Sequence, residues 1–155
     1  PYALTKLKAE LLAEQFTKNG LEVLGLRYFN VYGIGQTSTY AGVITQFLRN
    51  LNKNKPPIVN GDGNQLRDFI HVDDLINAFI QVIKSKLVNK IYNLGSGKRT
   101  SIVSIAKIFG GKKKFIPFRL GEPKNSLANI SKIKKDIGWR PKISIEEGIK
   151  KLLSS

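Results

Sequence analysis

The order of apolar and polar residues predicts helices and strands that alternate along the chain. Apolar side chains recur three or four positions apart within residues 2–18 and 73–86, a spacing that places them on one face of a helix. Short apolar runs within 21–33 and 90–97 are typical of buried strands that end in glycine turns. Weaker patterns of the same two kinds predict helices over 42–54, 101–110, 131–139 and 144–153, and extended segments within 56–72 and 112–118.

Polar residues stand where N-caps are expected for three of these helices. Asp73 or Asp74 is expected to cap the second long helix, and Ser131 is expected to cap a later short one. Ser144 and Glu147 have the spacing of a capping box, in which each side chain bonds the backbone N–H of the other residue. These residues mark where the helices should begin.

The alternation of strands with helices predicts an α/β fold with at least partly parallel strand pairing. Only three or four strands are evident, and no strand precedes the first helix. An open α/β sheet normally has both faces covered and its edges protected. The pattern therefore predicts that residues 1–155 are the second half of one larger domain, with no separate second domain.

The composition narrows the classes of partner. The formal net charge is +15, but the 26 basic residues are scattered, and no aromatic–basic alternation suggests base stacking, so we expect no specific nucleic-acid partner. With no cysteine and one histidine, His71, we expect no metal site and interpret His71 as structural. No apolar run approaches the roughly 18–20 residues of a membrane span. We therefore expect no membrane partner and take a cytoplasmic location as the default.

The first helix carries one pair of residues with possible chemistry. Tyr2 and Lys6 are four positions apart, so they share a helix face. An ammonium within about 4–6 Å favours a phenolate, which makes a tyrosine usable as a proton donor and acceptor at neutral pH. Taken alone, this spacing is more often that of a core tyrosine beside a solvated lysine.

The pair is accompanied by five further segments, and together they resemble a known family. The segments are "LRYFNVYG" at 26–33, "GDGNQLRDFIHVDDL" at 61–75, "YNLGSG" at 92–97, "RLGEPKNSLANISK" at 119–132 and "GWRPKISIEEGI" at 138–149. In this order they resemble the C-terminal half of the extended short-chain dehydrogenase/reductases. More narrowly, they resemble the NAD-dependent nucleotide-sugar epimerases and dehydratases, of which UDP-glucose 4-epimerase is the type. The resemblance covers the whole chain. It implies the end of a Rossmann-type fold with a small substrate-binding subdomain and without the first βαβ units.

The resemblance implies roles for residues that would lie near the reacting sugar. Tyr2 resembles the active-site acid/base, which exchanges a proton with the sugar hydroxyl during hydride transfer to and from the nicotinamide. Lys6 resembles the residue that bonds the nicotinamide ribose and favours ionisation of the tyrosine. Phe29 matches a position beside the cofactor, and Asn30 matches one that bonds the sugar nucleotide.

The resemblance also implies a set of nucleotide-sugar ligands further along the chain. A guanidinium matches phosphate oxygens bidentately, and a carboxylate can accept from two vicinal hydroxyls. The alternatives are a surface ion pair between Arg67 and Asp68, and a solvated loop charge at Arg119. The implied roles are nucleoside lining by Val43, Ile58, Val59 and Asn60, a diphosphate clamp of Arg67 and Arg119, and ribose binding by Glu122.

Ser126 matches a position that bounds the sugar pocket in the family. A bulky residue there is associated with plain hexoses, and a small one with tolerance of N-acetyl groups. Serine leaves the space that an aromatic ring would fill, so the sequence favours a pocket with room for an acetamido group.

The glycine-rich phosphate loop and the catalytic Ser or Thr of the family precede its tyrosine, and no segment here matches them. We therefore expect NAD as the cofactor, with its main binding loop in the missing N-terminal half. The chain is then a fragment or a naturally truncated product, which we expect to be inactive alone. The resemblance implies a 4-epimerase that acts on UDP-glucose and UDP-galactose or on the N-acetylated sugars. We therefore expect a UDP-sugar as ligand, and a homodimer through the first helix. The alternatives are a 4,6-dehydratase or decarboxylase of the same family, or a non-catalytic binding module.

Overall fold

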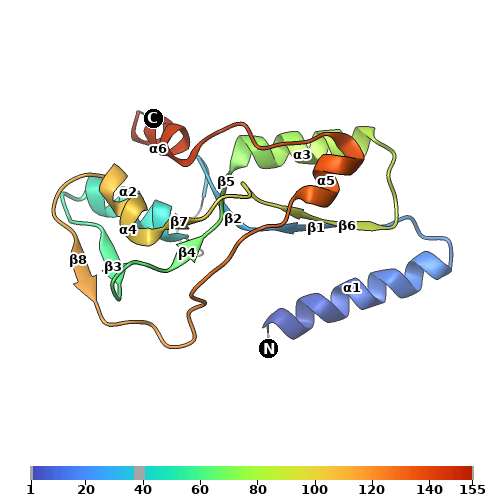
Figure 1. The fold of residues 1–155 in the computed structure, drawn as a ribbon, viewed down its shortest axis with the longest axis horizontal. Coiled ribbons are helices and arrows are strands. Elements are labelled where there is room, and N and C mark those ends of the chain that lie inside the picture. Colours follow the sequence, from blue (N-terminus) through green and yellow to red (C-terminus); the bar gives the residue numbers. More distant parts are fainter. Residues whose placement is uncertain (1, 37–40, 155) are drawn as a thin grey trace.

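The computed structural model describes residues 2–36 and 41–154 of the α/β chain (Figure 1). The described residues form six helices, namely α1 (Tyr2–Lys18), α2 (Val43–Asn52), α3 (Val72–Lys84), α4 (Ile102–Ile108), α5 (Ser131–Ile137) and α6 (Ile145–Leu153). They also form eight strands, namely β1 (Leu24–Tyr28), β2 (Asn30–Tyr32), β3 (Ile58–Asn60), β4 (Leu66–Arg67), β5 (Phe69–His71), β6 (Lys90–Leu94), β7 (Thr100–Ser101) and β8 (Lys114–Ile116).

The strands pair mainly in parallel, which confirms the expected α/β class. β1 pairs with β6, β2 with β5 and β3 with β8 in parallel, whereas β4 and β7 are antiparallel. The strand that pairs with this segment changes after Phe29. The Phe29 N–H donates to the Leu94 carbonyl of β6 at 2.9 Å, whereas the N–H of the next residue, Asn30, donates to the Asp68 carbonyl beside β5 at 3.2 Å. β1 and β2 thus form one extended run that joins the two halves of the molecule.

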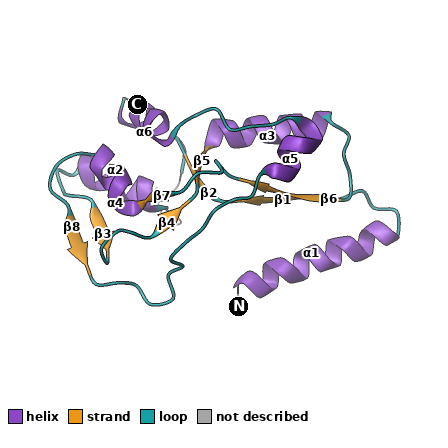
Figure 2. Ribbon diagram, viewed as in Figure 1, coloured by secondary structure: helices purple, strands orange, loops and turns teal. Residues whose placement is uncertain are grey.

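Helices α2 and α4 lie at one end of the molecule and α3 and α5 at the other (Figure 2), and each group packs on a hydrophobic core of its own. One core packs α2, α4 and α6 against β3 and β5, and its largest members include Phe47, Phe69 and Phe109. The other packs α3 and α5 against β1 and β6, with Trp139 and Tyr92 fully buried in it. The first core belongs to the part of the chain that carries the candidate site.

The first helix, α1, lies apart from both cores (Figure 1). The helix expected over residues 2–18 is present, but none of its described side chains is buried. An ion pair joins Arg27 of β1 to Glu10 of α1, with Arg27 Nε 2.6 Å from Glu10 Oε1. Five apolar side chains of α1 remain about half exposed, namely Leu4, Leu7, Leu11, Leu12 and Phe16.

The cap predicted for α3 is wrong, because the helix begins one residue earlier than expected. β5 runs directly into α3, so the N-cap is His71, whose Nδ1 accepts from the Asp73 N–H at 3.2 Å. Asp73 and Asp74 lie in the first turn, and the Asp74 carboxylate instead accepts from the backbone N–H groups of 142 and 143. His71 therefore has the structural role that the sequence indicated.

Of the two remaining cap predictions, the one for α5 is wrong and the one for α6 is confirmed. α5 begins after Ile130 without a side-chain cap, and Asn129 accepts from the Ser131 N–H at 3.0 Å, so Ser131 is not the cap. The capping box of Ser144 and Glu147 at the start of α6 is confirmed in both directions. The box begins α6, whose Ile149 and Leu152 pack in the first core.

Candidate functional site

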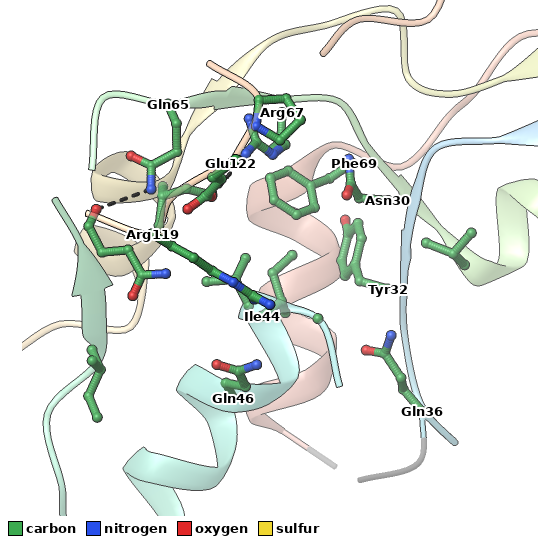
Figure 3. A pocket seen from close by; sticks show the side chains of 18 of the residues that line it. Asn30, Tyr32, Gln36, Ile44, Gln46, Gln65, Arg67, Phe69, Arg119 and Glu122 are labelled. Carbon is green, nitrogen blue, oxygen red and sulfur yellow. Dashed lines mark hydrogen bonds and ion pairs between the residues drawn. The ribbon is translucent and has the colours of Figure 1, made fainter. Parts of the chain in front are cut away.

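A cavity of about 470 Å³ opens where β2, β3, β4, β5, α2 and the loop at 119–123 meet (Figure 3). Apolar side chains form its floor, and amides and charged groups reach in from its sides. The cavity gathers residues that are far apart in the sequence. Seven of the predicted ligand-binding residues line it, namely Asn30, Val43, Ile58, Asn60, Arg67, Arg119 and Glu122.

The three residues of β3, which were all expected to line the nucleoside, do not all face the cavity. Successive side chains of a strand point to opposite faces. Ile58 and Asn60 line the cavity, whereas Val59 is fully buried in the first core. The structure therefore places Val59 beneath the cavity wall and not in it.

Arg67 and Glu122 form the main polar pair of the cavity. Arg67 Nη2 lies 2.9 Å from Glu122 Oε1, and the side chains are only 12% and 18% exposed. Arg67 Nη1 also donates to its neighbouring carbonyl on Leu66. The proposed alternative, a surface pair between Arg67 and Asp68, is wrong, because Asp68 is buried and bonds other groups. Glu122 Oε2 is buried without a hydrogen-bond partner among the described residues, so a ligand donor could satisfy it.

Arg119 supplies an uncompensated positive charge. Its side chain extends across the cavity toward Ile44 (Figure 3). It makes no ion pair or side-chain hydrogen bond with any other residue in the ranges 2–36 and 41–154. Because Glu122 offsets the charge of Arg67, the three charged lining residues leave a net charge of +1. The cavity thus combines anion-binding groups with a buried carboxylate acceptor.

The site also contains residues that the sequence reasoning missed. Gln65, Arg67 and Phe69 all line the cavity, so alternate residues of this extended segment face it. Gln65 Nε2 donates to the Asn60 carbonyl at 3.1 Å, while its Oε1 is buried without a partner among the described residues. The period of two within the segment at 61–75 was the signal that could have found Gln65.

Tyr32 forms another wall of the cavity but cannot readily carry protons. Burial, aided by the nearby Asp74 carboxylate, raises the pKa of Tyr32 above its ordinary value. Its hydroxyl donates to the Ser144 carbonyl at 3.3 Å, and its ring packs edge-on against His71. Tyr32 is therefore a structural wall in contact with α6.

Tyr2 and Lys6 lie in a different place. They line a second cavity of about 740 Å³ between α1 and the β1–β6 pair. Lys6 Nζ lies 5.5 Å from the centre of the Tyr2 ring, and Tyr2 is 75% exposed. Among the described residues, none lines both cavities. The structure therefore keeps the predicted catalytic pair together but does not bring it to the first cavity.

Phe29 and Ser126 line neither cavity. Phe29 is half-buried at the junction of β1 and β2. Ser126 is half-buried in the loop after Glu122, where its N–H donates to the Leu66 carbonyl at 3.0 Å. Their implied contacts with cofactor and sugar stay predictions.

The described residues contain neither a cluster of metal ligands nor a helix that could cross a membrane. No group of three or more His, Cys, Asp or Glu side chains within the described ranges could hold a metal ion. None of the helices in those ranges combines the length and hydrophobicity that a membrane crossing requires.

Comparison with known proteins assigns the family. The sequence profile of the NAD dependent epimerase/dehydratase family matches residues 1–95, more than half of the chain. The chain belongs to this family. It is 38% identical over 162 residues to UDP-glucuronate 4-epimerase of Thermodesulfobacterium geofontis, with 99% of this chain and 49% of that protein covered. Family members at 31% and 30% identity are a UDP-N-acetyl-alpha-D-glucosaminuronate decarboxylase of Bacillus cytotoxicus and the dTDP-D-glucose 4,6-dehydratase of Homo sapiens.

Solved structures of family members have the same fold. UDP-glucose 4-epimerase of Thermotoga maritima, crystallised with UDP-glucose, has a TM-score of 0.90 at 33% identity, covering 97% of this chain and 51% of that one. UDP-glucuronic acid 4-epimerase of Bacillus cereus, in complex with UDP-glucuronic acid and NAD, has a TM-score of 0.85 at 30% identity over 97% and 50%. The chain spans about half the length of the curated relatives it matches, and it corresponds to their C-terminal half.

Proposed function

We propose that the complete protein is a cytoplasmic NAD-dependent nucleotide-sugar 4-epimerase, and that this chain supplies its nucleotide-sugar-binding part. The observation that carries the proposal is the convergence of Arg67, Arg119 and Glu122 in one cavity. The family assignment and the relatives named for UDP-sugar 4-epimerisation support it.

The cavity suggests how the nucleotide is held. Arg119 and the free N–H groups of Arg67 bind the diphosphate, because guanidinium groups form strong charge-assisted bonds to phosphate oxygens. Glu122 Oε2, which is buried and has no hydrogen-bond partner among residues 2–36 and 41–154, accepts from the ribose hydroxyls. Ile58 and Asn60 flank the nucleoside from β3, and Val43 flanks it from α2.

Asn30 is the proposed contact to the sugar. Its Nδ2 donates to the Asp68 carbonyl at 2.8 Å, which fixes the amide and leaves Oδ1 to accept from a hydroxyl. Asn30 lines the cavity at the end of β2, beside Phe29. We place Phe29 near the cofactor and Ser126 at the rim of the sugar pocket, with room there for an N-acetyl group.

Tyr2 and Lys6 are the proposed catalytic residues. Bound NAD would accept a hydride from C4 of the sugar and return it to the opposite face of that carbon. Tyr2 then takes the proton of the 4-hydroxyl and returns it, and Lys6 holds the nicotinamide ribose. Tyr2 and Lys6 both line the cavity between α1 and the β1–β6 pair, so a cofactor whose nicotinamide end entered that cavity could contact both side chains. The glycine-rich loop that would bind the pyrophosphate is not among these 155 residues.

We also propose that α1 contributes to a homodimer and that the 155 residues alone do not turn over substrate. The half-exposed leucines of α1 support the first point, because an apolar helix face of this length gains stability when it is covered. The half-length match supports the second, since the relatives carry a further half that this sequence does not contain.

A second enzymatic assignment is a 4,6-dehydratase or decarboxylase. The relatives named for these two reactions at 30% identity or more support it. The same nucleotide cavity would serve each reaction, and groups outside these 155 residues would decide between them. A non-catalytic binding module is the remaining possibility if the chain acts without an N-terminal half.

The test is to incubate the complete protein with NAD and UDP-glucose, UDP-N-acetylglucosamine, UDP-glucuronate or dTDP-glucose, and to identify products by proton NMR. A C4 epimer supports the proposal, whereas a 4-keto-6-deoxy sugar or loss of carbon dioxide supports the second assignment. Tyr2→Phe should lower turnover by orders of magnitude and leave substrate affinity nearly unchanged, because the phenol acts on the transition state. Normal turnover of this variant would make Tyr2 a packing residue only.

A further inference from the structure

The buried carboxylate of Asp68 joins three separate segments of the chain. Asp68 is fully buried, and its carboxylate accepts four hydrogen bonds. Oδ1 accepts from the Ser96 N–H at 2.6 Å and from Ser96 Oγ at 2.7 Å. Oδ2 accepts from the N–H groups of Gly97 and Ala128, each at 3.0 Å. Such full pairing compensates for the cost of burying a charge.

Asp68 stands between two residues of the cavity wall. Arg67 and Phe69 line the cavity, and the Asp68 side chain points away from it, into the protein. The Asp68 backbone carbonyl also accepts from the N–H and Nδ2 of Asn30, at 3.2 and 2.8 Å. Asp68 therefore fixes the backbone from which Arg67 reaches the ligand, together with the side chain of Asn30.

The hydrogen bond from the Ala128 N–H connects Asp68 to the segment that forms the opposite wall of the cavity. Residues 119–128 carry Arg119 and Glu122, and no helix or strand lies within this segment. The segment is tied to the rest of the site by backbone bonds of residues 124 and 126 to Leu66, by the Arg67–Glu122 ion pair, and by Ala128 at its end. The Asp68 carboxylate thus anchors the loop that carries one arginine beside the strand that carries the other.

There is little space for Asp68 to adjust. A Cβ added at Gly95 would lie 2.8 Å from Asp68 Oδ2 and 2.4 Å from the Ala128 Cβ. An asparagine would fit this volume, but its Nδ2 would replace one of the two oxygens that accept hydrogen bonds. The Nδ2 group is itself a donor, so it would face the donors that now bond that oxygen. At least one of the four bonds would then become a repulsive contact between donors.

We propose that Asp68 is the positioning residue of the cavity. It sets the separation between Arg67 on β4 and Arg119 on the loop, and thereby the grip on a diphosphate, without touching the ligand. The identity of the ligand rests on the function proposed above, whereas the positioning of residues 119–128 does not.

The chain offers a matched control in Asp74. Asp74 is also buried, and its carboxylate accepts from the N–H groups of Lys142 and Ile143 at 3.0 and 2.9 Å. It ties α3 to the segment before α6 and is not among the residues that line the cavity. Asp68→Asn and Asp74→Asn therefore make the same chemical change at two buried junctions, only one of which carries the arginines.

The experiment compares the two variants in the 155-residue chain by UDP calorimetry and by hydrogen exchange, below the unfolding midpoint of both. Both should unfold at lower temperature than the wild type. Asp68→Asn should weaken UDP binding about 3- to 30-fold, the range of coupling through a packed network. It should also accelerate exchange at residues 119–128, and Arg119→Ala should cost less affinity in this background than in the wild type. Asp74→Asn should leave affinity and this exchange unchanged.

Unchanged affinity and unchanged exchange in folded Asp68→Asn would overturn the proposal. If Asp68→Asn does not fold, Ser96→Ala decides, because it removes the Oγ bond to Asp68 and otherwise only two local bonds to the backbone of Lys98. Ser85→Ala is its control, since Ser85 Oγ makes two local backbone bonds of the same kind. Equal affinities and exchange rates for these two serine variants would also overturn the proposal. If the wild-type chain itself does not bind UDP, the nucleotide assignment fails. The exchange of residues 119–128 then decides the role of Asp68 by itself.

Discussion

At the residue scale, Arg67 and Arg119 reach the same cavity in different states. Arg67 is held by Glu122 and by a backbone carbonyl, whereas the Arg119 side chain has no partner among the described residues. Arg67 is therefore positioned in advance, and Arg119 brings the charge that is not yet compensated. A diphosphate that bridges them would use both properties.

Alanine at either arginine should weaken UDP binding by about 2–3 kcal/mol, or about 30–150-fold, because each loses charge-assisted bonds to the diphosphate. Calorimetry on the complete protein at moderate salt measures this loss. Arg140→Ala is the control, since it removes an exposed arginine that lines neither described cavity. Arg140→Ala and the lysine variant Lys113→Ala should each cost under about 1 kcal/mol. Small, equal losses at all four positions would mean diffuse attraction by the +15 charge and no specific clamp.

His71 should make the fold sensitive to mild acid. Burial lowers the pKa of His71 below its ordinary value, and the nearby Lys151 lowers it further against the opposing effect of Asp73. The unfolded chain therefore binds a proton more readily than the folded one. The free energy of unfolding should decrease as the pH falls below the ordinary histidine value of about 6.5.

His71→Asn tests this, because asparagine can still cap α3 but does not titrate. Urea unfolding at several pH values between 5.5 and 7.5 should give a flatter dependence for the variant than for the wild type. Carboxylates that titrate at lower pH are common to both proteins. Parallel slopes would mean that protonation of His71 is no more costly in the folded protein than in the unfolded one.

At this scale, sequence reasoning located most of the cavity but not its full lining. The quoted family segments gave Arg67, Arg119 and Glu122, which the structure brings together. They could not separate Val59 from its neighbours, because the direction of each side chain depends on how β3 pairs with β8. Gln65 was missed because only Arg67 was singled out in this segment, although Gln65, Arg67 and Phe69 follow the period of two that places them on one face.

At the scale of elements, α1 is a helix without a buried side chain, and its apolar side chains are about half exposed. An apolar helix face without a partner should cause self-association of the 155-residue chain. Light scattering should show particles larger than a monomer at high concentration. Leu7→Gln combined with Leu11→Gln should shift the chain toward the monomer without lowering its unfolding temperature, because neither leucine is buried.

Ile83→Gln on α3 is the control, since Ile83 is an apolar side chain that is even more exposed. It should leave the association unchanged. A monomeric wild-type chain, or equal association of all variants, would argue against the proposed helix interface.

The sequence predicted the α/β class and the helices because apolar residues recur at regular intervals along the helical segments. It did not predict the antiparallel pairing of β4 with β7, since each strand is two residues long and has no period of its own. It also misplaced the start of α3, because a strand that runs directly into a helix leaves no loop in which an aspartate could cap. Short elements and junctions are set by tertiary contacts, which a linear pattern does not contain.

At the scale of the whole molecule, the two cavities are independent. α1 contributes no lining residue to the first cavity and no member to either core. A chain that begins at Leu21 should therefore fold and bind UDP within about 2-fold of the 155-residue chain. Calorimetry and far-ultraviolet circular dichroism measure both properties.

A matched truncation at the other end provides the contrast. Removal of residues 144–155 deletes α6, whose Ile149 and Leu152 belong to the first core and whose capping region contacts Tyr32. This truncation should abolish UDP binding. If loss of α1 proved equally damaging, the first helix would have a role in the cavity that the described contacts do not contain.

The separation of the two cavities has a consequence for how the family diversifies. In the function proposed above, the groups that bind the nucleotide and the groups that move protons line separate cavities, so a substitution in one set would leave the other set in place. An ancestor could change the fate of the sugar without rebuilding the site that holds the nucleotide. Epimerases, dehydratases and decarboxylases that all resemble this chain are what such descent would produce. Divergence should then be fastest around the sugar and slowest around the arginines, a pattern that ancestral reconstruction across the family would measure.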